Sequence, residues 1–410
     1  MKIGLRELND VTKKYKELLL KDIESKAILL EKVEECICCK NKKFEKLLDV
    51  DRFDLPFGSY ICKDCGLVTT SPRIKQESLP YYYEKYYHPI NYGKESLENQ
   101  TALFKEGQGK KIFDKLKPYI KAKSKLSILE IGAGVGNVLD EFKVEATIKN
   151  IEVDLLGTEY SDECIIQCEK KNISTIKGNA ETILTTGKTF DLIILSHVFE
   201  HFIDLNNELT ILKKLLDKDG LLYIEVPGIL DIHDKEYYDF SFLGYSVHAH
   251  MYNFSLKTLT NVAQNNNFTL LEGNEEVTAI FQQSETKKIT SQNSSVEILK
   301  YLDYLKNDKI IFTKIFTKLN KDIEKYKTQV ENRNKDIEKY KTQVENRNKD
   351  IEKYKTQVEN KNNENKSLKD ILMNIQKSYS KIKSISIIQN PHKKYKAYTN
   401  LMKEINATKS

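Results

Sequence analysis

The chain has 410 residues, with 66 Lys or Arg against 60 Asp or Glu, so its formal net charge at neutral pH is only +6. This length allows two or three folded parts. Charges of both signs are mixed along the chain, which differs from the concentrated basic patch of a nucleic-acid-binding protein. No apolar run is long enough to span a membrane and no apolar signal region opens the chain, so we expect a cytoplasmic protein.

The first 35 residues predict a charged helix, because apolar positions such as Leu18, Leu19 and Ile23 recur among lysines and glutamates. Residues 36–95 follow as a cysteine-bearing module with a tyrosine-rich connector, "YYYEKYYHPINYG", at 81–93. We expect most of these tyrosines to pack the module onto the domain that follows.

Two C-x-x-C pairs lie in this module, Cys36 with Cys39 and Cys62 with Cys65. Seven cysteines in a chain of this size do not form the dense pattern of a disulfide scaffold, and paired cysteines in a reducing cytosol indicate metal ligands. Four thiolates are enough to close a tetrahedral site. The sequence therefore predicts a structural Zn²⁺ bound by these four cysteines.

Residues 96–288 predict an α/β domain. Short apolar runs of strand type alternate with helical segments, and they are "SILEIG", "LLGTEYS", "STIKG", "FDLIILSH" and "GLLYIEVPG". Such alternation is typical of a parallel sheet with helices on both faces. After the fifth strand, a helix and the runs "FTLLEGN" and "TAIFQQSE" are expected to complete the sheet with a hairpin.

The loop after the first of these strands is rich in glycine. Gly132, Gly134 and Gly136 give G-x-G-x-G, and Asn137 stands where the dinucleotide fingerprint needs its third glycine. Glu130 precedes the loop on the strand, where a carboxylate would repel a pyrophosphate but can accept hydrogen bonds from a cationic amino-acid ligand. This combination favours S-adenosylmethionine over NAD as the cofactor.

Later strand ends supply further candidates for the cofactor site. Glu159 ends the second strand, where its carboxylate can accept both ribose hydroxyls, and Asn179 with Ala180 follows the third, where adenine would lie. His197 opens the loop after the fourth strand and borders the cofactor. The H-x-x-E-H pattern from His197 to His201 also occurs in zinc proteases, but their histidines share a helix face and His197 ends a predicted strand.

Beyond residue 289 the composition changes to a helical repeat. "NKDIEKYKTQVENR" begins at Asn320 and recurs at 334 and 348, so each copy spans two heptads. Its β-branched residues fall at heptad position a, and Asn365 continues that position as a device that fixes register. We expect a parallel coiled coil within 289–380 that forms a homo-oligomer through 320–376, followed by a basic tail at 381–410. The alternative is a solvated single helix, which over 80 residues would reach about 120 Å.

Together these motifs resemble the class I S-adenosylmethionine-dependent methyltransferases. The resemblance rests on E-x-G-x-G-x-G, G-x-E, G-N-A-E, F-D-x-I-x-x-x-H-V-x-E-H and G-x-L-x-I-E-V-P, which occur in the family's order over 105–285. It implies a Rossmann-like sheet, with S-adenosylmethionine bound at the glycine loop and the strand ends that follow.

Two further segments refine the resemblance. "YICKDCGLVTTSPR" followed by "YYYEKYY" is similar to the zinc module of methyltransferases that act on nucleotide-linked sugars or surface-polysaccharide glycans. "HAHMYNFSLKTL" resembles the H-E-H-x-x-x-F-S-x-x-(S/T)-L segment of the sugar C-methyltransferases, whose second histidine, a base, falls on His250. The glutamate between the histidines is replaced by Ala249. O-methylation is therefore expected at least as much as C-methylation.

The resemblance and the chemistry of methyl transfer together suggest the catalytic residues. A neutral histidine is suited to removing the acceptor's proton, so His250 is predicted to be the base, with His248 or Glu200 assisting. His248 has an equally plain structural interpretation as a satisfied loop histidine. A sugar or glycan acceptor also suggests docking to a glycan-assembly complex, which would bring the protein to the inner face of the membrane.

Two other functions fit parts of the sequence. RNA methyltransferases also join a four-cysteine module to this fold, but this module lacks basic residues interleaved with aromatic ones, so nucleic acid is not the expected partner. The near-perfect repeat suggests instead a scaffold protein whose methyltransferase domain is vestigial. Failure to bind cofactor would support that alternative.

Overall fold

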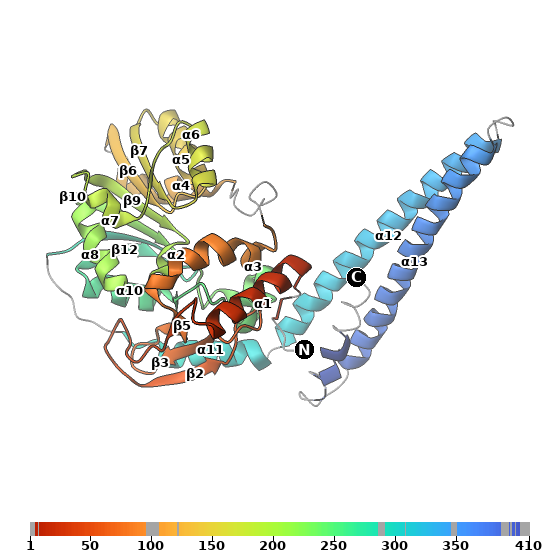
Figure 1. The fold of residues 1–410 in the computed structure, drawn as a ribbon, viewed down its shortest axis with the longest axis horizontal. Coiled ribbons are helices and arrows are strands. Elements are labelled where there is room, and N and C mark those ends of the chain that lie inside the picture. Colours follow the sequence, from red (N-terminus) through yellow and green to blue (C-terminus); the bar gives the residue numbers. More distant parts are fainter. Residues whose placement is uncertain are drawn as a thin grey trace. The chain divides into compact units, whose positions relative to one another are not determined.

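The computed structural model describes residues 5–6, 8–95, 106–120, 123–285, 292–307, 309–345, 351–386, 393, 396–397 and 399–401. The chain divides into two compact units (Figure 1). One comprises residues 8–302, and the other comprises residues 1–7 with 303–410. No helix in the described ranges has the length and apolar character needed to cross a membrane.

The larger unit contains a seven-stranded sheet in the order β12-β13-β10-β9-β6-β7-β8. Its strands are β6 (Lys125–Ile131), β7 (Glu152–Glu159), β8 (Ser174–Lys177), β9 (Phe190–Ser196), β10 (Leu216–Glu225), β12 (Phe268–Gly273) and β13 (Thr278–Gln283). The first five are parallel, and β13 and β12 complete the sheet as an antiparallel hairpin. The predicted α/β sheet and hairpin are confirmed. The strand order reverses between β6 and β9, and ligands of such sheets bind beside that point, at the strands' carboxyl ends.

Helices cover both faces of this sheet. Because side chains alternate along a strand, Ile128 and Leu192 enter one apolar core, and Leu129 and Ile193 enter the other. The first core is closed by α4 (Gln108–Ile120), α5 (Asn137–Ile148) and α6 (Asp162–Lys170), and the second by α7 (Ala180–Leu184), α8 (Leu205–Leu215) and α10 (Leu256–Asn265).

The predicted N-terminal helix is shorter than expected. Helix α1 spans Asp10–Glu24, and Ser25 caps its end. Lys26 then takes a left-handed backbone with φ of 62°, which ends the helical path. The chain continues into β1 (Leu30–Glu31), which pairs with β5 (Arg73–Ile74). The prediction of a helix to residue 35 is therefore wrong after Glu24.

The cysteine module is built on a four-stranded antiparallel sheet, β11-β4-β3-β2. Three strands belong to the module itself, β2 (Phe44–Leu48), β3 (Gly58–Cys62) and β4 (Val68–Ser71). The fourth, β11 (Tyr252–Asn253), comes from the segment after β10 and pairs with Thr69 and Val68 of β4. The module and the α/β domain are thus one unit, and the predicted boundary at residue 96 does not separate two independent bodies.

The tyrosine-rich connector forms α2 (Leu79–Tyr82), a π-helical turn η2 (Tyr83–Tyr87) and α3 (His88–Tyr92). The side chains of Tyr82 and Tyr86 are fully buried, which agrees with the expected packing role. Single π-helical turns are rare in proteins, and those that occur are often at functional sites. This one brings Tyr83 toward the histidines described below.

The smaller unit is a helical hairpin. Helix α11 (Ser295–Asn307) crosses the division between the units, and α12 (Lys309–Glu345) and α13 (Ile351–Ser386) follow. Helices α12 and α13 lie side by side and run in opposite directions (Figure 1). They are joined by a salt bridge of 2.9 Å from Arg333 to Glu364 and by a hydrogen bond of 2.6 Å from Asn365 Nδ2 to Asn334 Oδ1.

The hairpin corrects the expected parallel coiled coil and the expected single long helix. Three residues at heptad position a are buried within this one chain, namely Ile323, Val330 and Ile337. Because every 14-residue copy carries the same apolar positions, a second arm of the same chain can cover them without another copy. The buried Asn365 does pair with another polar residue, but within the chain. The predicted basic tail at 381–410 is described only to Ser386 and at a few later positions.

Candidate active site

The glycine loop joins β6 to α5 beside the point where the strand order reverses. Gly132, Gly134 and Gly136 all have left-handed φ values, of 69°, 55° and 77°. A Cβ on Gly134 would meet nothing within 4 Å, whereas one on Gly136 would lie 2.9 Å from Ile173 Cδ1. Gly134 therefore borders open space and Gly136 packs against the core. Glu130, on β6, is buried with 2% of its surface exposed.

The carboxylate of Glu159 holds this loop to the end of β7. Its Oε2 accepts the Gly134 N–H at 2.9 Å, and its Oε1 accepts the N–H groups of Tyr160 and Ser161 at 2.7 and 3.0 Å. A carboxylate can accept about four hydrogen bonds. One more donor therefore fits directly, and binding both ribose hydroxyls, as predicted from the sequence, requires one backbone donor to give way.

Asn179 and Ala180, the residues predicted to lie beside adenine, form the start of helix α7. Asn179 is the N-cap of α7, where its Oδ1 accepts the Thr182 N–H at 3.2 Å. Ala180 is fully buried as the first residue of that helix. The two residues lie at the carboxyl end of β8, as expected, but their side chains are occupied with capping and packing.

His197 directly follows β9 and has a backbone conformation that non-glycine residues rarely adopt, with φ of 58°. Its N–H donates to the Glu225 carbonyl at 2.7 Å, which holds this turn. The ring lies over the end of β10, with Nε2 3.8 Å from Glu225 Oε1, and 35% of the side chain is exposed. The carboxyl group of Glu225 also receives hydrogen bonds from Tyr223 and Gln108.

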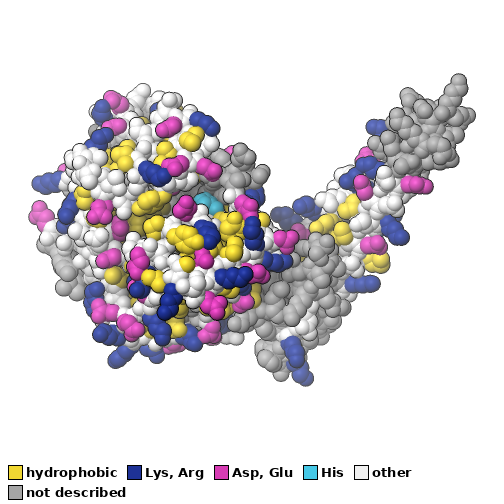
Figure 2. Space-filling view, viewed as in Figure 1, with side chains coloured by type: hydrophobic (Ala, Val, Ile, Leu, Met, Phe, Trp, Pro, Cys, Tyr) yellow, Lys and Arg dark blue, Asp and Glu magenta, His cyan; other side chains and the backbone are white. Residues whose placement is uncertain are grey.

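A buried carboxylate lies at the centre of a histidine cluster. Glu200, on the short 3₁₀ turn η5 (Phe199–His201), is 2% exposed. Its Oε1 lies 3.8 Å from His197 Nδ1, 3.8 Å from His201 Nε2 and 3.9 Å from His250 Nε2. The predicted base and its predicted assistant are thus brought together from segments 50 residues apart. Histidine side chains are visible in a recess on the face shown in Figure 2.

His201 was not predicted as a site residue, although it closes the H-x-x-E-H pattern. Its Nδ1 lies 2.9 Å from the Ala249 carbonyl oxygen and 3.2 Å from Tyr83 Oη. A carbonyl oxygen only accepts hydrogen bonds, so Nδ1 carries the proton. Nε2 therefore presents its lone pair toward Glu200 when the ring is neutral.

His250 is held in a half-buried position by the cysteine module. The Thr70 hydroxyl donates to its carbonyl at 2.6 Å, and its Nδ1 has no hydrogen-bond partner among the described residues. Desolvation, followed by the nearby His201 and Arg52, lowers the pKa of His250 well below 6.5. The imidazole is consequently neutral at pH 7, with Nε2 toward Glu200 and a buried Nδ1 that has no partner among the described residues.

His248, the other predicted assistant, lies in a separate buried network. Its Nδ1 is 2.6 Å from Asp51 Oδ2, its Nε2 is 2.7 Å from Tyr82 Oη, and its ring stacks on Phe57 at 5.0 Å. Both ring nitrogens are thus engaged with residues of the module and the connector. This geometry supports a positioning role for His248, and sequence reasoning missed Asp51, which had no motif to mark it.

Replacing Asp51 by alanine is expected to destabilise the larger unit by about 3–5 kcal/mol, because His248 would remain buried without its charged partner. Asp51 also accepts the N–H groups of Phe53 and Leu55, so the loop would loosen as well. Chemical unfolding should measure the loss. The control is Asp54→Ala, which removes an exposed carboxylate and should change stability by less than about 1 kcal/mol.

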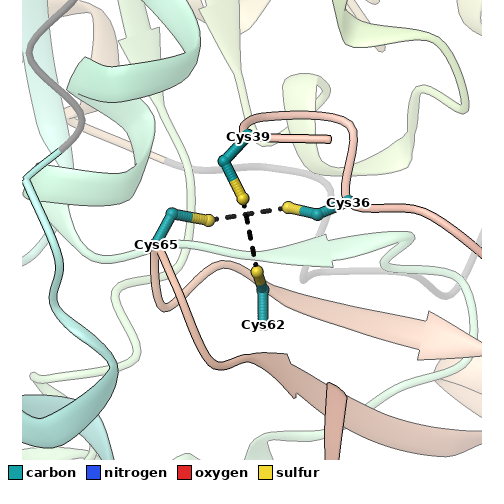
Figure 3. A group of neighbouring side chains, drawn as sticks. All are labelled: Cys36, Cys39, Cys62 and Cys65. Atoms are coloured by element: carbon teal, nitrogen blue, oxygen red, sulfur yellow. Dashed lines mark hydrogen bonds between the residues drawn. The ribbon is translucent and has the colours of Figure 1, made fainter. Parts of the chain in front are cut away.

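The four predicted ligand cysteines converge in the module (Figure 3). Their sulfur atoms all lie within 4.8 Å of one another, with Cys36 to Cys65 at 3.5 Å and Cys39 to Cys62 at 3.4 Å. In a tetrahedral Zn–S₄ site with Zn–S bonds of about 2.3 Å, neighbouring sulfur atoms lie about 3.8 Å apart, which is close to these separations. The cluster could therefore hold one metal ion, and the donor set suits zinc.

A second group of donors meets the same spacing criterion. One ligand atom each from Glu200, His201 and His250 lies within 4.8 Å of the others. These are also the groups that the sequence and geometry connect with proton transfer. A metal ion bound to Nε2 of His250 would leave the ring proton on Nδ1. Nδ1 could then not accept the acceptor's proton, so metal binding and general-base catalysis by His250 exclude each other.

Residues 104–272 match a family model described as a methyltransferase domain. No curated protein matches the chain. Among solved structures, the plantazolicin methyltransferase BamL, in complex with a triazolic desmethylPZN analog and SAH, is similar at 17% identity. The match covers 54% of this chain and 81% of that one, with a TM-score of 0.35.

A SAM-dependent methyltransferase from Thermotoga maritima matches at 17% identity, over 46% of this chain and 94% of that one, with a TM-score of 0.31. Coclaurine N-methyltransferase, bound to N-methylheliamine and SAH, matches at 18% identity, over 40% and 50%, with a TM-score of 0.30. The family match and the seven-stranded sheet together identify this enzyme's residues 104–272 as a methyltransferase domain of the class I fold.

Proposed function

We propose that the protein transfers a methyl group from S-adenosylmethionine to an oxygen or carbon of a sugar, in a nucleotide-linked sugar or a surface-polysaccharide glycan. The observation that carries this proposal is the position of His250. The base predicted from the sugar methyltransferase segment lies beside a buried carboxylate, anchored by the zinc-type module that the same enzymes carry.

The glycine loop fits S-adenosylmethionine. The open space beside Gly134 is a cradle that any side chain would fill, and Glu159 and the buried Glu130 supply the acceptors for hydroxyl and ammonium donors. When bound there, the cofactor supplies an activated methyl group on a sulfonium. The chain's own contribution is to align the acceptor and to remove its proton.

His250 is the general base in this mechanism. Its Nδ1 takes the acceptor proton, while Glu200 on the Nε2 side stabilises the imidazolium that forms. Asp51 and Tyr82 hold His248, and the segment from His248 to Tyr252 holds His250 in place through β11 and β4. Replacement of the family's glutamate by Ala249 supports oxygen at least as well as carbon as the acceptor atom.

Aromatic residues of the connector support a sugar acceptor. The rings of Tyr83 and Tyr87 lie 6.3 and 5.9 Å from His201, beside the same cluster. Amphipathic aromatic rings suit the apolar face of a sugar while their hydroxyls bond to its polar groups. Basic and acidic side chains are interspersed on the face shown in Figure 2, which gives the RNA alternative no single-sign surface there.

The test is a methylation assay with labelled S-adenosylmethionine and three acceptor sets, nucleotide-linked sugars, glycans and RNA. Label in a sugar confirms the proposal, and the NMR shift of the new methyl carbon tells O-methyl from C-methyl. Label only in salt-sensitive RNA complexes would establish the RNA alternative. Absence of both turnover and S-adenosylhomocysteine binding by the folded protein would support the vestigial scaffold.

Alanine at Gly134 is expected to lower affinity for S-adenosylhomocysteine about tenfold or more, because a methyl group would enter the cradle and strain a left-handed backbone. Isothermal titration calorimetry measures the loss. Gly136→Ala is the matched control, since its Cβ meets the core and should cost about 1–3 kcal/mol in stability. Equal affinity in Gly134→Ala and the unmodified protein would place the cofactor elsewhere.

We also propose that zinc fills the four-cysteine site and that the helical hairpin docks this cytoplasmic enzyme to a second copy or to a glycan-assembly complex at the inner face of the membrane. The exposed faces of α12 and α13, rich in charged residues, support the docking role. Light scattering of the full chain and of a chain ending at residue 302 would test self-association.

A further inference from the structure

Methyl transfer in this site creates a proton that has to leave a buried position. Glu200 is 2% exposed, and the side chain of His250 is 16% exposed. A base whose pKa lies well below 6.5 does not retain the proton it takes. A route from His250 to solvent is therefore part of the chemistry, if the proposed function is right.

We propose that Glu200, His197 and Glu225 form a proton relay that carries the acceptor's proton from His250 to the surface. Carboxylate and imidazole alternate along it. His250 Nε2 lies 3.9 Å from Glu200 Oε1, which lies 3.8 Å from His197 Nδ1, and His197 Nε2 lies 3.8 Å from Glu225 Oε1. Each of these distances exceeds a hydrogen bond by about 1 Å, so a small side-chain rotation at each step brings donor and acceptor together.

The position of the His197 ring is maintained at a conformational cost. The residue adopts a left-handed φ of 58°, and the hydrogen bond from its N–H to the Glu225 carbonyl holds the turn. That turn places one ring nitrogen toward each carboxylate. Rare backbone conformations that persist at a site point to a functional role for the residue.

The third histidine on Glu200 cannot serve the same purpose. His201 also lies 3.8 Å from Glu200 Oε1 through Nε2, but its Nδ1 proton faces the Ala249 carbonyl oxygen. A carbonyl oxygen does not take up a proton, so this branch ends there. His197, in contrast, has a partly exposed ring with a second carboxylate on its far side.

Charged and titratable groups surround the relay on several elements. Burial, and then the charges of His201, Arg52, His197 and His248, lower the pKa of His250. Burial is also the main cause that raises the pKa of Tyr83, Tyr92 and Tyr245, and the Glu200 charge adds to it. At the outer end, Gln108, Ser196 and Tyr223 donate to Glu225. The raised pKa values of these tyrosines keep them protonated at neutral pH, so they do not replace the relay's imidazoles and carboxylates.

Each group of the relay releases one proton for each proton that it accepts. As the sulfonium–methyl bond breaks and the acceptor–methyl bond forms, the acceptor's O–H or C–H proton moves to His250 Nδ1. The imidazolium releases its Nε2 proton to Glu200, which passes it to His197 Nδ1. His197 releases its Nε2 proton to Glu225 or directly to water, and tautomer exchange returns both rings to their starting state.

The experiment compares methyl transfer with proton release in the full-length enzyme, using His197→Asn. Asparagine tolerates the left-handed backbone but cannot carry a proton. A pH indicator in weak buffer should show release coincident with methylation in the unmodified enzyme. In the variant we expect release to lag and kcat to fall about tenfold or more. Added imidazole should restore kcat, and the KM for S-adenosylmethionine should stay unchanged.

The matched control is His201→Asn, which alters another histidine on the same carboxylate and should not be rescued by imidazole. Unchanged kcat in His197→Asn, or a loss that imidazole does not restore, would overturn the relay. A rise in KM for S-adenosylmethionine with unchanged kcat would make His197 the cofactor contact predicted from the sequence. A second metal ion per chain that is lost in Glu200→Gln would assign the cluster to metal binding instead.

An equilibrium measurement separates failure of the relay from failure of the proposed function. In the unmodified protein, NMR titration of the histidine rings should show His197 and His250 coupled through Glu200. The His250 titration should shift in His197→Asn whether or not a sugar is the acceptor. If that titration does not move, the relay is wrong even in an active methyltransferase.

Discussion

Asparagine at position 250 is expected to lower kcat by about 10²- to 10⁴-fold while leaving S-adenosylhomocysteine affinity within about twofold. The reason is that the proposed mechanism places His250 at the acceptor and not at the glycine loop, and removal of a general base has an effect of this size. Steady-state kinetics and calorimetry measure the two quantities. A comparable loss of cofactor affinity would contradict the assigned role.

The pH dependence gives the same residue a second signature. Because the pKa of folded His250 lies well below 6.5, the base stays neutral as pH falls through 6.5, and the acid limb of the rate profile should lie below that value. The unfolded chain binds a proton near pH 6.5, so stability falls as pH drops below it. His250→Asn should reduce this acid sensitivity, as urea unfolding at pH 5 and pH 7.5 would show.

Loss of Cys62, a proposed zinc ligand, is expected to remove one zinc ion per chain and to lower the melting temperature of the larger unit by about 10 °C or more. A structural zinc site contributes folding free energy directly, and each kcal/mol shifts the midpoint by about 2–4 °C in a unit of this size. Activity should also disappear, because β4 of the module pairs with β11, next to His250. Elemental analysis, calorimetry and turnover of Cys62→Ser measure the three effects.

A neighbouring cysteine provides the control for this substitution. Cys38 lies in the same knuckle and is 6% exposed, but it does not belong to the four-sulfur cluster. Cys38→Ser should retain one zinc per chain and lower stability only by the cost of placing a hydroxyl in the core. If Cys62→Ser keeps its melting temperature and activity, the cluster is dispensable and the module is held by its apolar contacts alone.

The local pattern of the sequence determined much of this protein. Alternating apolar runs predicted each parallel strand and the closing hairpin, because strand and helix periodicities differ. The glycine loop and each C-x-x-C pair were also recognised from the sequence, because the residues of each motif lie within a few positions of one another.

Only the tertiary structure decided how the distant segments meet. The pairing of β11 with β4 joins Tyr252 to Thr69 and Asn253 to Val68, residues more than 180 positions apart. It places His250 beside Glu200 and gives His248 its partner Asp51. The repeat predicted heptads but not whether the helices would pack parallel or antiparallel. Identical apolar positions in each copy can pack against another chain or against a second helix of the same chain. Sequence periodicity specifies which face of an element is buried, and long-range packing specifies what buries it.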